Sequence, residues 1–394
     1  MSPDQPTLHV CMVNPFVTQI VGGVQRQLYL QSRALVERGV GVSVLQRRDG
    51  DWTPAKAAQW GHVRMLEVPE GPRALGVRGR GLLFLAGGLR HLARHRRSIS
   101  LVHAHQLSSP ALLAVLARTL FGIPVVAKVT ASGSWGEMAE LGSLPLARLR
   151  RRFLRSIDRI LVLTEGMREE VVASLGLSPD RVAILPNCVQ APDVFPERSF
   201  PRDGPFALLY TGRLSEEKSL ETLIEAAGLL VERGLGPVEV HLVGPVFAPR
   251  DPMPRLRAAM AALDPRARVL LHGHQEDLAP FYRRADAFVL PSQSEGMSNA
   301  LLEAMAAGTC CVVSDIPENR ALIDDGEQGL LFVQGDARSL AGRLASLHED
   351  QRGRAGERSS RLARAAHARV RATYSVDAVT RALVGIYEES RRAR

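Results

Sequence analysis

Two glutamates separated by seven residues stand out in the segment PSQSEGMSNALLEAMAAG, which spans residues 291–308. Glu295 precedes an expected helix, and Glu303 lies inside that helix among Leu, Ala and Met residues. The helix carries no other charge, whereas a solvated stripe usually carries more. A carboxylate accepts two hydroxyl hydrogen bonds, so Glu303 suits the diol of a ribose. The alternative is that Glu303 belongs to an ordinary solvated stripe.

The start of this helix is suited to phosphate. Ser298 is expected to cap a helix that ends at Ala307, with Gly308 as its stop. Helix N-termini offer N–H groups and a partial positive charge to anions. Asn299 and Glu303 share one face, and Glu303 lies about 6 Å along the axis from the first turn. Phosphates bound at the helix start would therefore place a ribose beside Glu303, with Glu295 directed towards whatever the phosphates carry.

Two basic residues lie at a second strand-to-helix turn, TGRLSEEK. Arg213 directly follows Thr211 and Gly212, and its guanidinium can bind phosphate through two parallel hydrogen bonds. Lys218 can act as a point charge on the same group. For Arg213 we favour a functional role. For Lys218 alone, a surface charge at a solvated helix start is the preferred interpretation.

Adjacent glycines, Gly22 and Gly23, open the first expected helix. Such glycines allow a backbone to approach a phosphate, although a flexible helix start explains them equally well. The loop is not G-x-G-x-x-G, so the dinucleotide fingerprint of dehydrogenases is absent.

Apolar runs such as LHVCMV, IPVVAKV, FALLYTG and AFVLPS alternate with helical stretches along the whole chain. Continuous apolar runs are typical of strands buried on both faces. The alternation predicts an α/β fold with doubly wound parallel sheets. The candidate ligand-binding residues, including Gly244 after VEVHLV, follow the ends of the expected strands. Ligands bind at these strand ends in open α/β sheets.

The length of 394 residues favours two domains. A segment rich in Pro and charge, residues 189–206, has the composition of a linker. We therefore expect Rossmann-like domains over residues 1–195 and 204–375 that face each other across a cleft. The C-terminal helix, within residues 376–394, is expected to pack back onto the first domain.

Composition narrows the class of protein. Apolar residues make up 45% of the chain, and the net charge of +9 favours an anionic partner such as a nucleotide or a phospholipid surface. The four cysteines show no C-x-x-C spacing, so we expect neither a disulfide framework nor a zinc site. The first apolar run lacks a preceding basic region and is interpreted as a strand, not a signal peptide. We expect a cytoplasmic protein.

Six motifs, in order along the chain, resemble those of the retaining glycosyltransferases of family 4, which have the GT-B fold. The motifs are VGGVQRQLYLQSRALVERGVGVSV, LVHAHQ, RVAILPNCV, YTGRLSEEKSLETLIEAA, ADAFVLPSQSEGMSNALLEAMAAGTCCVVSD and IDDGEQGLLF. The resemblance implies a transferase of the hexosyltransferase type that moves a sugar from a nucleotide-diphospho-sugar, UDP-linked, to a hydroxyl acceptor. It also implies a place in polysaccharide, glycolipid or glycoconjugate biosynthesis.

The resemblance also implies roles for residues. Glu303 would bind the ribose and Glu295 the donor sugar, while Arg213 and Lys218 would hold the diphosphate and stabilise it as it departs. The implied donor site comprises Gly22, Gly23, Arg213, Lys218, Gly244, Glu295, Gly296, Met297, Ser298, Asn299 and Glu303. The family needs no metal or other cofactor, and no D-x-D metal motif is apparent. Attack from the front face, with the leaving phosphate taking the acceptor proton, needs no protein nucleophile.

The sequence departs from the family pattern in two places. Many members carry a His after the strand read here as IPVVAKVT, but KVTASGSWGE has none. Ser132, Gly133 or Lys128 could substitute for it. The closing turn reads Pro-Asn-Cys instead of Pro-Asn-Gly, and Cys188 tolerates positive φ poorly, so the turn type is expected to differ.

Two histidines end the strand LVHAH. We expect only one of them to face the cleft, His105 on the acceptor side, with His103 in a structural role.

Two segments, residues 81–97 and 144–157, combine apolar residues with arginines, as interfacial helices on anionic lipid do. Core-packed helices with a solvated arginine face are the commoner explanation of each. Because acceptors in the family are often lipid-linked, we predict weak peripheral contact with the inner face of the cell membrane.

Three other functions stay open at this point. A nucleotide-sugar epimerase can use the same two-domain fold. A non-catalytic nucleotide-sugar binder is disfavoured by the intact set of Arg213, Lys218, Glu295 and Glu303. Nucleic-acid binding is allowed by the charge but supported by no recognition motif.

Overall fold

The structure is a computed structural model that describes residues 8–17, 22–48, 58–69, 71–72, 76–131, 136–139, 147–248, 251–353 and 355–392. The chain divides into two compact units. The first unit comprises Met1–Cys188 and Val376–Arg394, and the second comprises Val189–Ser375. Residues 189–195, which the sequence assigned to the first domain, therefore belong to the second unit.

The first unit is built on a seven-stranded sheet in the order β3-β2-β1-β4-β5-β6-β7. Every strand pair in it is parallel. Its strands are β1 (His9–Val13), β2 (Gly41–Arg47), β3 (Arg64–Val68), β4 (Leu101–His105), β5 (Val125–Lys128), β6 (Arg159–Val162) and β7 (Val182–Ile184). Its α-helices are α1 (Gly23–Glu37), α3 (Gly76–His95), α4 (Ser109–Phe121), α6 (Ala147–Leu154), α7 (Glu165–Leu175) and α15 (Val376–Arg392).

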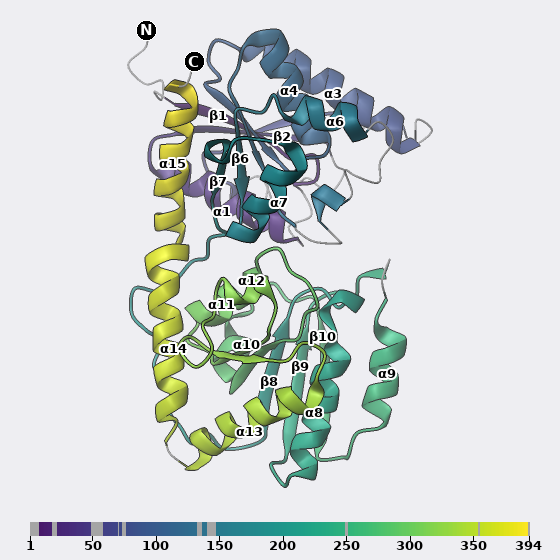
Figure 1. The fold of residues 1–394 in the computed structure, drawn as a ribbon, viewed down its shortest axis with the longest axis vertical. Helices are drawn as coiled ribbons and strands as arrows, with labels where there is room; N and C mark the ends of the chain where they lie inside the picture. Colours follow the sequence, from purple (N-terminus) through teal and green to yellow (C-terminus); the bar gives the residue numbers. More distant parts are fainter. Residues whose placement is uncertain are drawn as a thin grey trace. The chain divides into compact units, whose positions relative to one another are not determined.

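The C-terminal helix α15 completes the core of the first unit. It packs against α1, while α3 packs against α4 (Figure 1). Val379, Leu383 and Tyr387 of α15 are buried in the same apolar cluster as strands β1 and β2. These residues are spaced four apart and so share one face of α15, which packs on this unit.

The second unit is built on a six-stranded parallel sheet in the order β10-β9-β8-β11-β12-β13. Its strands are β8 (Phe206–Thr211), β9 (Val238–Val243), β10 (Ala267–Gly273), β11 (Ala287–Leu290), β12 (Cys311–Ser314) and β13 (Leu330–Phe332). Its α-helices are α8 (Leu220–Glu232), α9 (Met253–Ala261), α10 (Ala279–Arg284), α11 (Asn299–Ala306), α12 (Pro317–Arg320), α13 (Ala337–Gly353) and α14 (Glu357–Arg369).

The continuous apolar runs form fully buried central strands. Every residue of β4, β5, β11 and β12 is buried, because helices cover both faces of a doubly wound sheet. The predicted fold class, two parallel-sheet α/β domains, is confirmed. Among the described residues, no helix has both the length and the apolar character needed to cross a membrane.

Candidate functional site

The sheet order of the second unit brings two polar loops together. Strands β8 and β11 are neighbours, so the loops that follow them, residues 212–219 and 291–298, meet at the carboxyl edge. The Gln293 backbone N–H donates to the Glu217 carbonyl at 2.9 Å, and the Gln293 side chain donates to Ser219 Oγ at 2.7 Å. Ser219 has a left-handed backbone with φ of 47°. The two loops therefore form one hydrogen-bonded platform.

An ion pair joins the two loops. Lys218 Nζ lies 2.6 Å from Glu295 Oε1, and Ser292 Oγ donates to the same oxygen at 2.6 Å. Only 14% of the Lys218 side chain and 10% of the Glu295 side chain are exposed. Lys218 is therefore not a solvated charge at a helix start, which was the preferred interpretation of this residue on its own. Sequence reasoning also missed Ser292 and Gln293, which support the platform.

Arg213, on the same loop as Lys218, lies over an aromatic ring. Its side chain is exposed, and its guanidinium carbon lies 4.7 Å from the centroid of the Phe247 ring. Its backbone carbonyl accepts a 2.7 Å hydrogen bond from the Tyr210 hydroxyl. Burial raises the pKa of Tyr210 well above its ordinary value, so this hydroxyl remains a donor. Stacking and the fixed backbone hold Arg213 at the rim of the edge.

Glycines allow two loops at this edge to touch. Gly212 and Gly244 have φ of 142° and 146°, conformations that favour glycine. A Cβ atom on Gly244 would lie 1.8 Å from the Gly212 carbonyl oxygen. The loops after β8 and β9 also share backbone bonds, from Leu214 N–H to the Pro245 carbonyl and from Phe247 N–H to the Leu214 carbonyl. Gly244 is thus required by backbone packing, whatever it contributes to a ligand.

Helix α11 begins after the predicted cap and ends at Ala306, one residue before the predicted end at Ala307. Ser298 is its N-cap and accepts a hydrogen bond from Leu301 N–H at 3.2 Å, and Gly308 follows its end with φ of 64°. Met297 and Ser298 are buried, whereas Gly296 and Asn299 are half-buried. These four residues therefore line the start of the helix.

Glu303 is half-buried one turn into α11 and does not lie on an open solvated stripe. Its Oε2 atom lies 3.2 Å from the hydroxyl of Tyr282, on helix α10. Sequence reasoning missed Tyr282, because nothing in the spacing of the chain relates α10 to α11.

The paired glycines lie in the first unit. Gly23 is the first residue of α1, and Gly22 is its N-cap with an extended backbone. A Cβ on Gly22 would lie 2.3 Å from the side-chain oxygen of Gln25. Because this oxygen is the far end of a flexible side chain and the backbone of Gly22 is extended, packing within the first unit does not by itself require glycine at this position.

The carboxyl edge of the first sheet carries His103 and His105, and here one expectation is wrong. Residues two apart in a strand lie on the same face, not on opposite faces. The two rings are adjacent, with centroids 4.2 Å apart. The His103 Nδ1 atom shares a 2.7 Å hydrogen bond with the Tyr387 hydroxyl of α15, in keeping with a structural role.

His105 and Lys128 are buried side by side. They pair between β4 and β5, and each is 1% exposed. Burial, followed by the charge of Lys128, lowers the pKa of His105 to about 3. Lys128 Nζ donates to Asn187 Oδ1 at 3.2 Å, and burial lowers its pKa to about 8. Neither side chain is open to an acceptor in this structure.

A glutamate that the sequence analysis did not single out, Glu137, holds the loop that follows β5. Glu137 accepts hydrogen bonds from the backbone and hydroxyl of Thr130, at 2.7 and 2.8 Å, and from Leu107 N–H at 2.6 Å. It thereby ties together the loops that follow β4 and β5. Ser132 and Gly133, two proposed substitutes for the missing histidine, lie outside the described residues.

The closing turn of the first unit differs from a glycine turn. Cys188 does not have positive φ. Its N–H donates to Gln27 Oε1 at 2.8 Å, and its carbonyl accepts from Gln27 Nε2 at 2.7 Å. The side-chain amide of Gln27, on α1, thus bonds to both the N–H and the carbonyl of Cys188. In the part of the chain that the structure describes, no group of three or more His, Cys, Asp or Glu side chains could hold a metal ion.

Family models match both units. Residues 22–188 match a glycosyl transferase 4-like domain, and residues 205–350 match the glycosyl transferases group 1. The chain is 27% identical to D-inositol 3-phosphate glycosyltransferase of Thermomonospora curvata, over 97% of this chain and 94% of that protein. It is 26% identical to glycogen synthase of Mycobacterium tuberculosis, over 95% and 92% of the two chains.

A third relative covers less of the chain. This enzyme is the UDP-Gal:alpha-D-GlcNAc-diphosphoundecaprenol alpha-1,3-galactosyltransferase of Escherichia coli, 27% identical over 65% of this chain and 68% of that protein.

Solved structures show the same fold. Anabaena HepE, crystallised with UDP and glucose, superimposes with a TM-score of 0.76 at 15% identity, over 97% of this chain and 100% of that chain. Sucrose-phosphate synthase of Thermosynechococcus elongatus gives a TM-score of 0.75 at 20% identity, over 98% and 100% of the two chains. With both units matched by family models and both sheets built as in these structures, the chain belongs to the group 1 glycosyltransferases, family 4, of the GT-B fold.

Proposed function

We propose that this glycosyltransferase moves a sugar from a UDP-linked donor to a hydroxyl acceptor with retention of anomeric configuration. The observation that carries the proposal is the charged edge of the second unit. There the Lys218–Glu295 ion pair at 2.6 Å lies on the platform between β8 and β11, with Arg213 at the rim. HepE, which shares the fold, was crystallised with UDP and with UDP-glucose.

The proposed chemistry assigns one task to each group. Arg213 and Lys218 bind the diphosphate and stabilise the negative charge that it gains as the bond from the sugar C1 breaks. Glu303 accepts hydrogen bonds from the ribose hydroxyls, and Glu295 accepts from the donor sugar. The acceptor oxygen forms its bond to C1 on the face that the diphosphate leaves. The acceptor proton passes to a departing phosphate oxygen.

No side chain is assigned as a nucleophile. Glu295 already accepts hydrogen bonds from Lys218 and Ser292, and such bonds weaken a carboxylate as a nucleophile. Both positive groups are side chains of this chain, so we propose catalysis without a metal ion or another cofactor. The diphosphate competes with Glu295 for Lys218, and Glu295 is then released to contact the sugar.

The proposed acceptor is a glycan, a lipid-linked molecule or a small hydroxyl compound. The names of the relatives include an inositol phosphate acceptor and a diphosphoundecaprenol-linked sugar. On this basis we propose a role in polysaccharide, glycolipid or glycoconjugate biosynthesis.

Weak contact with anionic membrane is proposed for α6. Arg148, Arg150 and Arg152 of this helix are exposed, and Leu149 among them is 60% exposed, while Leu154 is buried. An exposed leucine within a row of arginines suits a lipid interface. Flotation on vesicles with and without anionic lipid tests this contact. Equal flotation on both kinds of vesicle would refute it.

Calorimetric titration in EDTA tests the proposed donor site. Wild-type protein is titrated with UDP, GDP and ADP, followed by the Glu303→Ala variant. We expect selective binding of UDP, weakened at least about tenfold in the variant through the loss of hydrogen bonds to a charged group. Glu225→Ala is the matched control, because Glu225 is an exposed glutamate on helix α8 of the same unit.

Binding of no nucleoside diphosphate would refute the proposal. Equal binding to Glu303→Ala and wild type would refute the ribose role alone. A donor sugar that is altered and released as nucleotide-sugar without any acceptor would identify an epimerase instead.

A further inference from the structure

The hydroxyl of Tyr282 lies among three oxygen atoms, one of which belongs to Glu303, the residue proposed to bind the ribose. It is 2.7 Å from Thr211 Oγ1, 3.2 Å from Glu303 Oε2 and 3.3 Å from the Ala300 carbonyl. Tyr282 itself is 3% exposed. The hydroxyl thus joins the end of strand β8, helix α10 and helix α11, three elements that are separate in the sequence.

The number of protons on each group shows which atom donates in each of these hydrogen bonds. A tyrosine hydroxyl has one proton, and a carboxylate has none. The Thr211 hydroxyl can donate to the Tyr282 oxygen, which leaves the Tyr282 proton for the carboxylate or the Ala300 carbonyl. The carboxylate is the stronger acceptor, because hydrogen bonds to ionised groups are the strong ones. Burial, and then the charge of Glu303, raises the pKa of Tyr282 well above its ordinary value, so the proton is retained.

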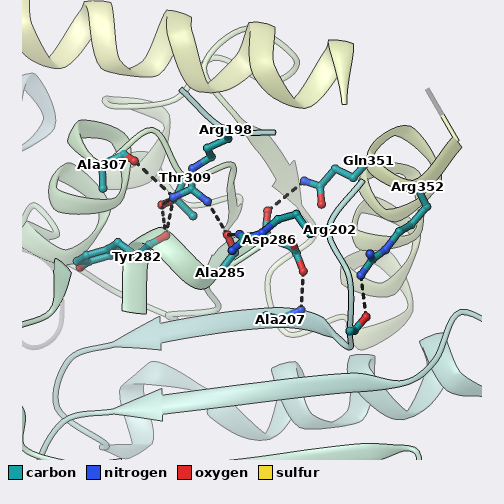
Figure 2. Close-up of polar contacts among 11 residues, drawn as sticks. Arg198, Arg202, Ala207, Tyr282, Ala285, Asp286, Ala307, Thr309, Gln351 and Arg352 are labelled. Atoms are coloured by element: carbon teal, nitrogen blue, oxygen red, sulfur yellow. Dashed lines mark hydrogen bonds and ion pairs between the residues drawn. The ribbon is translucent and has the colours of Figure 1, made fainter. Parts of the chain in front are cut away.

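The backbone of Tyr282 is held by hydrogen bonds from Arg198 (Figure 2). The guanidinium of Arg198 donates to the Tyr282 carbonyl, to the Ala285 carbonyl at 2.7 Å and to Thr309 Oγ1 at 2.8 Å. Thr309 Oγ1 donates to the same Tyr282 carbonyl at 3.1 Å. A further contact, at 3.4 Å, reaches the Ala307 carbonyl.

Arg198 therefore contacts the C-terminal carbonyls of both α10 and α11. A cation at helix C-termini is favoured by their partial negative charge. Helix α10 carries Tyr282 and helix α11 carries Glu303. The Arg198 guanidinium therefore links the backbones of the two helices that carry these side chains. Arg198 lies within the segment 189–206 that the sequence marked as a linker.

We propose that Tyr282 is a positioning residue, which holds the Glu303 carboxylate in the orientation that accepts the ribose hydroxyls. The inference rests on the proposed function of Glu303. A glutamate loses side-chain entropy when it is fixed by a ligand. Holding it in place beforehand improves affinity, since preorganisation reduces the entropy lost on binding. The Tyr282 bond uses one of about four lone-pair sites on the carboxylate, which leaves capacity for a diol.

The test measures how well the protein recognises ribose hydroxyls, not affinity alone. Dissociation constants of UDP and of 2′,3′-dideoxy-UDP are determined by calorimetry for wild type and Tyr282→Phe. The preference for UDP over the dideoxy analogue should fall about five- to tenfold in the variant, the size expected for a hydrogen bond to a charged group. A general loss of structure would weaken both ligands equally and leave the preference unchanged.

Tyr374→Phe is the matched control. It removes the hydroxyl of another buried tyrosine in the same unit, one that donates to the Ala321 carbonyl at 3.3 Å. Its preference for UDP should equal that of wild type. A second test introduces Tyr282→Phe into Glu303→Ala, where no further loss of preference is expected because Tyr282 acts through Glu303.

The outcomes distinguish a failure of the proposed ribose role of Glu303 from a failure of the positioning role of Tyr282. A wild-type protein that does not distinguish UDP from the dideoxy analogue overturns the ribose role of Glu303, and the inference with it. A wild-type protein that distinguishes them, with an unchanged preference in Tyr282→Phe, overturns the inference alone. If Tyr282→Phe does not fold, Thr211→Val serves in its place, with an expected loss of preference of about twofold. An unchanged preference in Thr211→Val would then overturn the inference.

Discussion

The two parallel sheets of the chain end in edges of opposite character. At the carboxyl edge of the first sheet, His103, His105 and Lys128 are at most 1% exposed. Burial lowers the pKa of each of these bases. At the edge of the second sheet, Lys218 is paired with Glu295, and Arg213 is exposed.

The same topology therefore supports two kinds of chemistry. At the first edge, His103 Nδ1 bonds to Tyr387 and Lys128 to Asn187, whereas both ring nitrogens of His105 are buried without a hydrogen-bond partner among the described residues. The second edge pairs Lys218 with Glu295 and leaves Arg213 exposed at its rim, and we propose that a bound diphosphate takes the place of Glu295 as the partner of Lys218. Binding a diphosphate requires cations that stay charged. The first edge does not suit this task, because burial there disfavours the charged forms of its bases.

The largest effect is expected from a substitution that forces apart the two packed loops at the edge of the second sheet. Gly244→Ala places a Cβ 1.8 Å from the Gly212 carbonyl, at a φ of 146°. We expect the second unit to lose on the order of 3 kcal/mol of stability and nucleotide binding to be lost. Scanning calorimetry, with and without UDP, measures both effects.

Gly342→Ala is the control for this change. A Cβ there meets nothing within 4 Å, inside helix α13 of the same unit. It should raise stability by about 0.5–1 kcal/mol, because alanine favours a helix interior. A Gly244→Ala protein with wild-type melting and binding would contradict the close packing of the two loops.

A smaller effect is expected from breaking the ion pair of the second edge. Glu295→Gln removes the charge that is paired with Lys218 and that, in the proposed mechanism, competes with a diphosphate for it. Affinity for free UDP should be equal to or greater than that of wild type, while kcat/KM for sugar transfer falls about 10- to 100-fold. Titration and initial-rate measurements on the same sample separate the two parameters. If free UDP binds at least tenfold more weakly, Glu295 contacts the nucleotide and not the sugar.

The smallest effect concerns the first edge. Unfolded lysine has a pKa near 10.4, and folded Lys128 a pKa of about 8. Below pH 8 both states bind the proton, so the folded state carries the full penalty of a buried charge. Between pH 8 and about 10.4 the folded state releases its proton first, and stability rises with pH. Lys128→Met should therefore stabilise the first unit at pH 7 by roughly 1–3 kcal/mol, an advantage that disappears by about pH 10.5.

Denaturant titrations at pH 7 and at higher pH measure this difference. All three tryptophans lie in the first unit, so their fluorescence reports on it alone. Arg150→Met, at an exposed position on α6, serves as a control whose effect should not change over this range. A Lys128→Met protein that is less stable than wild type at pH 7 would show that the lysine supports the fold.

Local rules predict elements well in this chain. The cap at Ser298 and the stop at Gly308 follow from residue types alone, so the bounds of α11 were predictable. Contacts between distant residues were not predictable. Lys218 and Glu295 are 77 residues apart, and Tyr282 and Glu303 belong to different helices. Charge type made Lys218 resemble a surface residue, and only the sheet order places it beside Glu295.

Burial also escaped prediction at the first edge. The strand LVHAH indicates that His103 and His105 end a strand, but not that α15 covers His103 with Tyr387, 284 residues later. The assignment of the two histidines to opposite faces was an error in applying the two-residue period of a strand. The chain of hydrogen bonds from Thr211 through Tyr282 to Glu303 leaves no spacing pattern, because each member comes from a different element.

Hydrogen–deuterium exchange with and without saturating UDP tests the contrast between the two edges most directly. We expect UDP to slow exchange in residues 212–219 and 291–307 of the second unit. Peptides that contain His103, His105 and Lys128 should exchange at the same rate with and without UDP. Protection confined to those first-unit peptides, with none at residues 212–219 or 291–307, would contradict the assignment of the donor site to the second sheet.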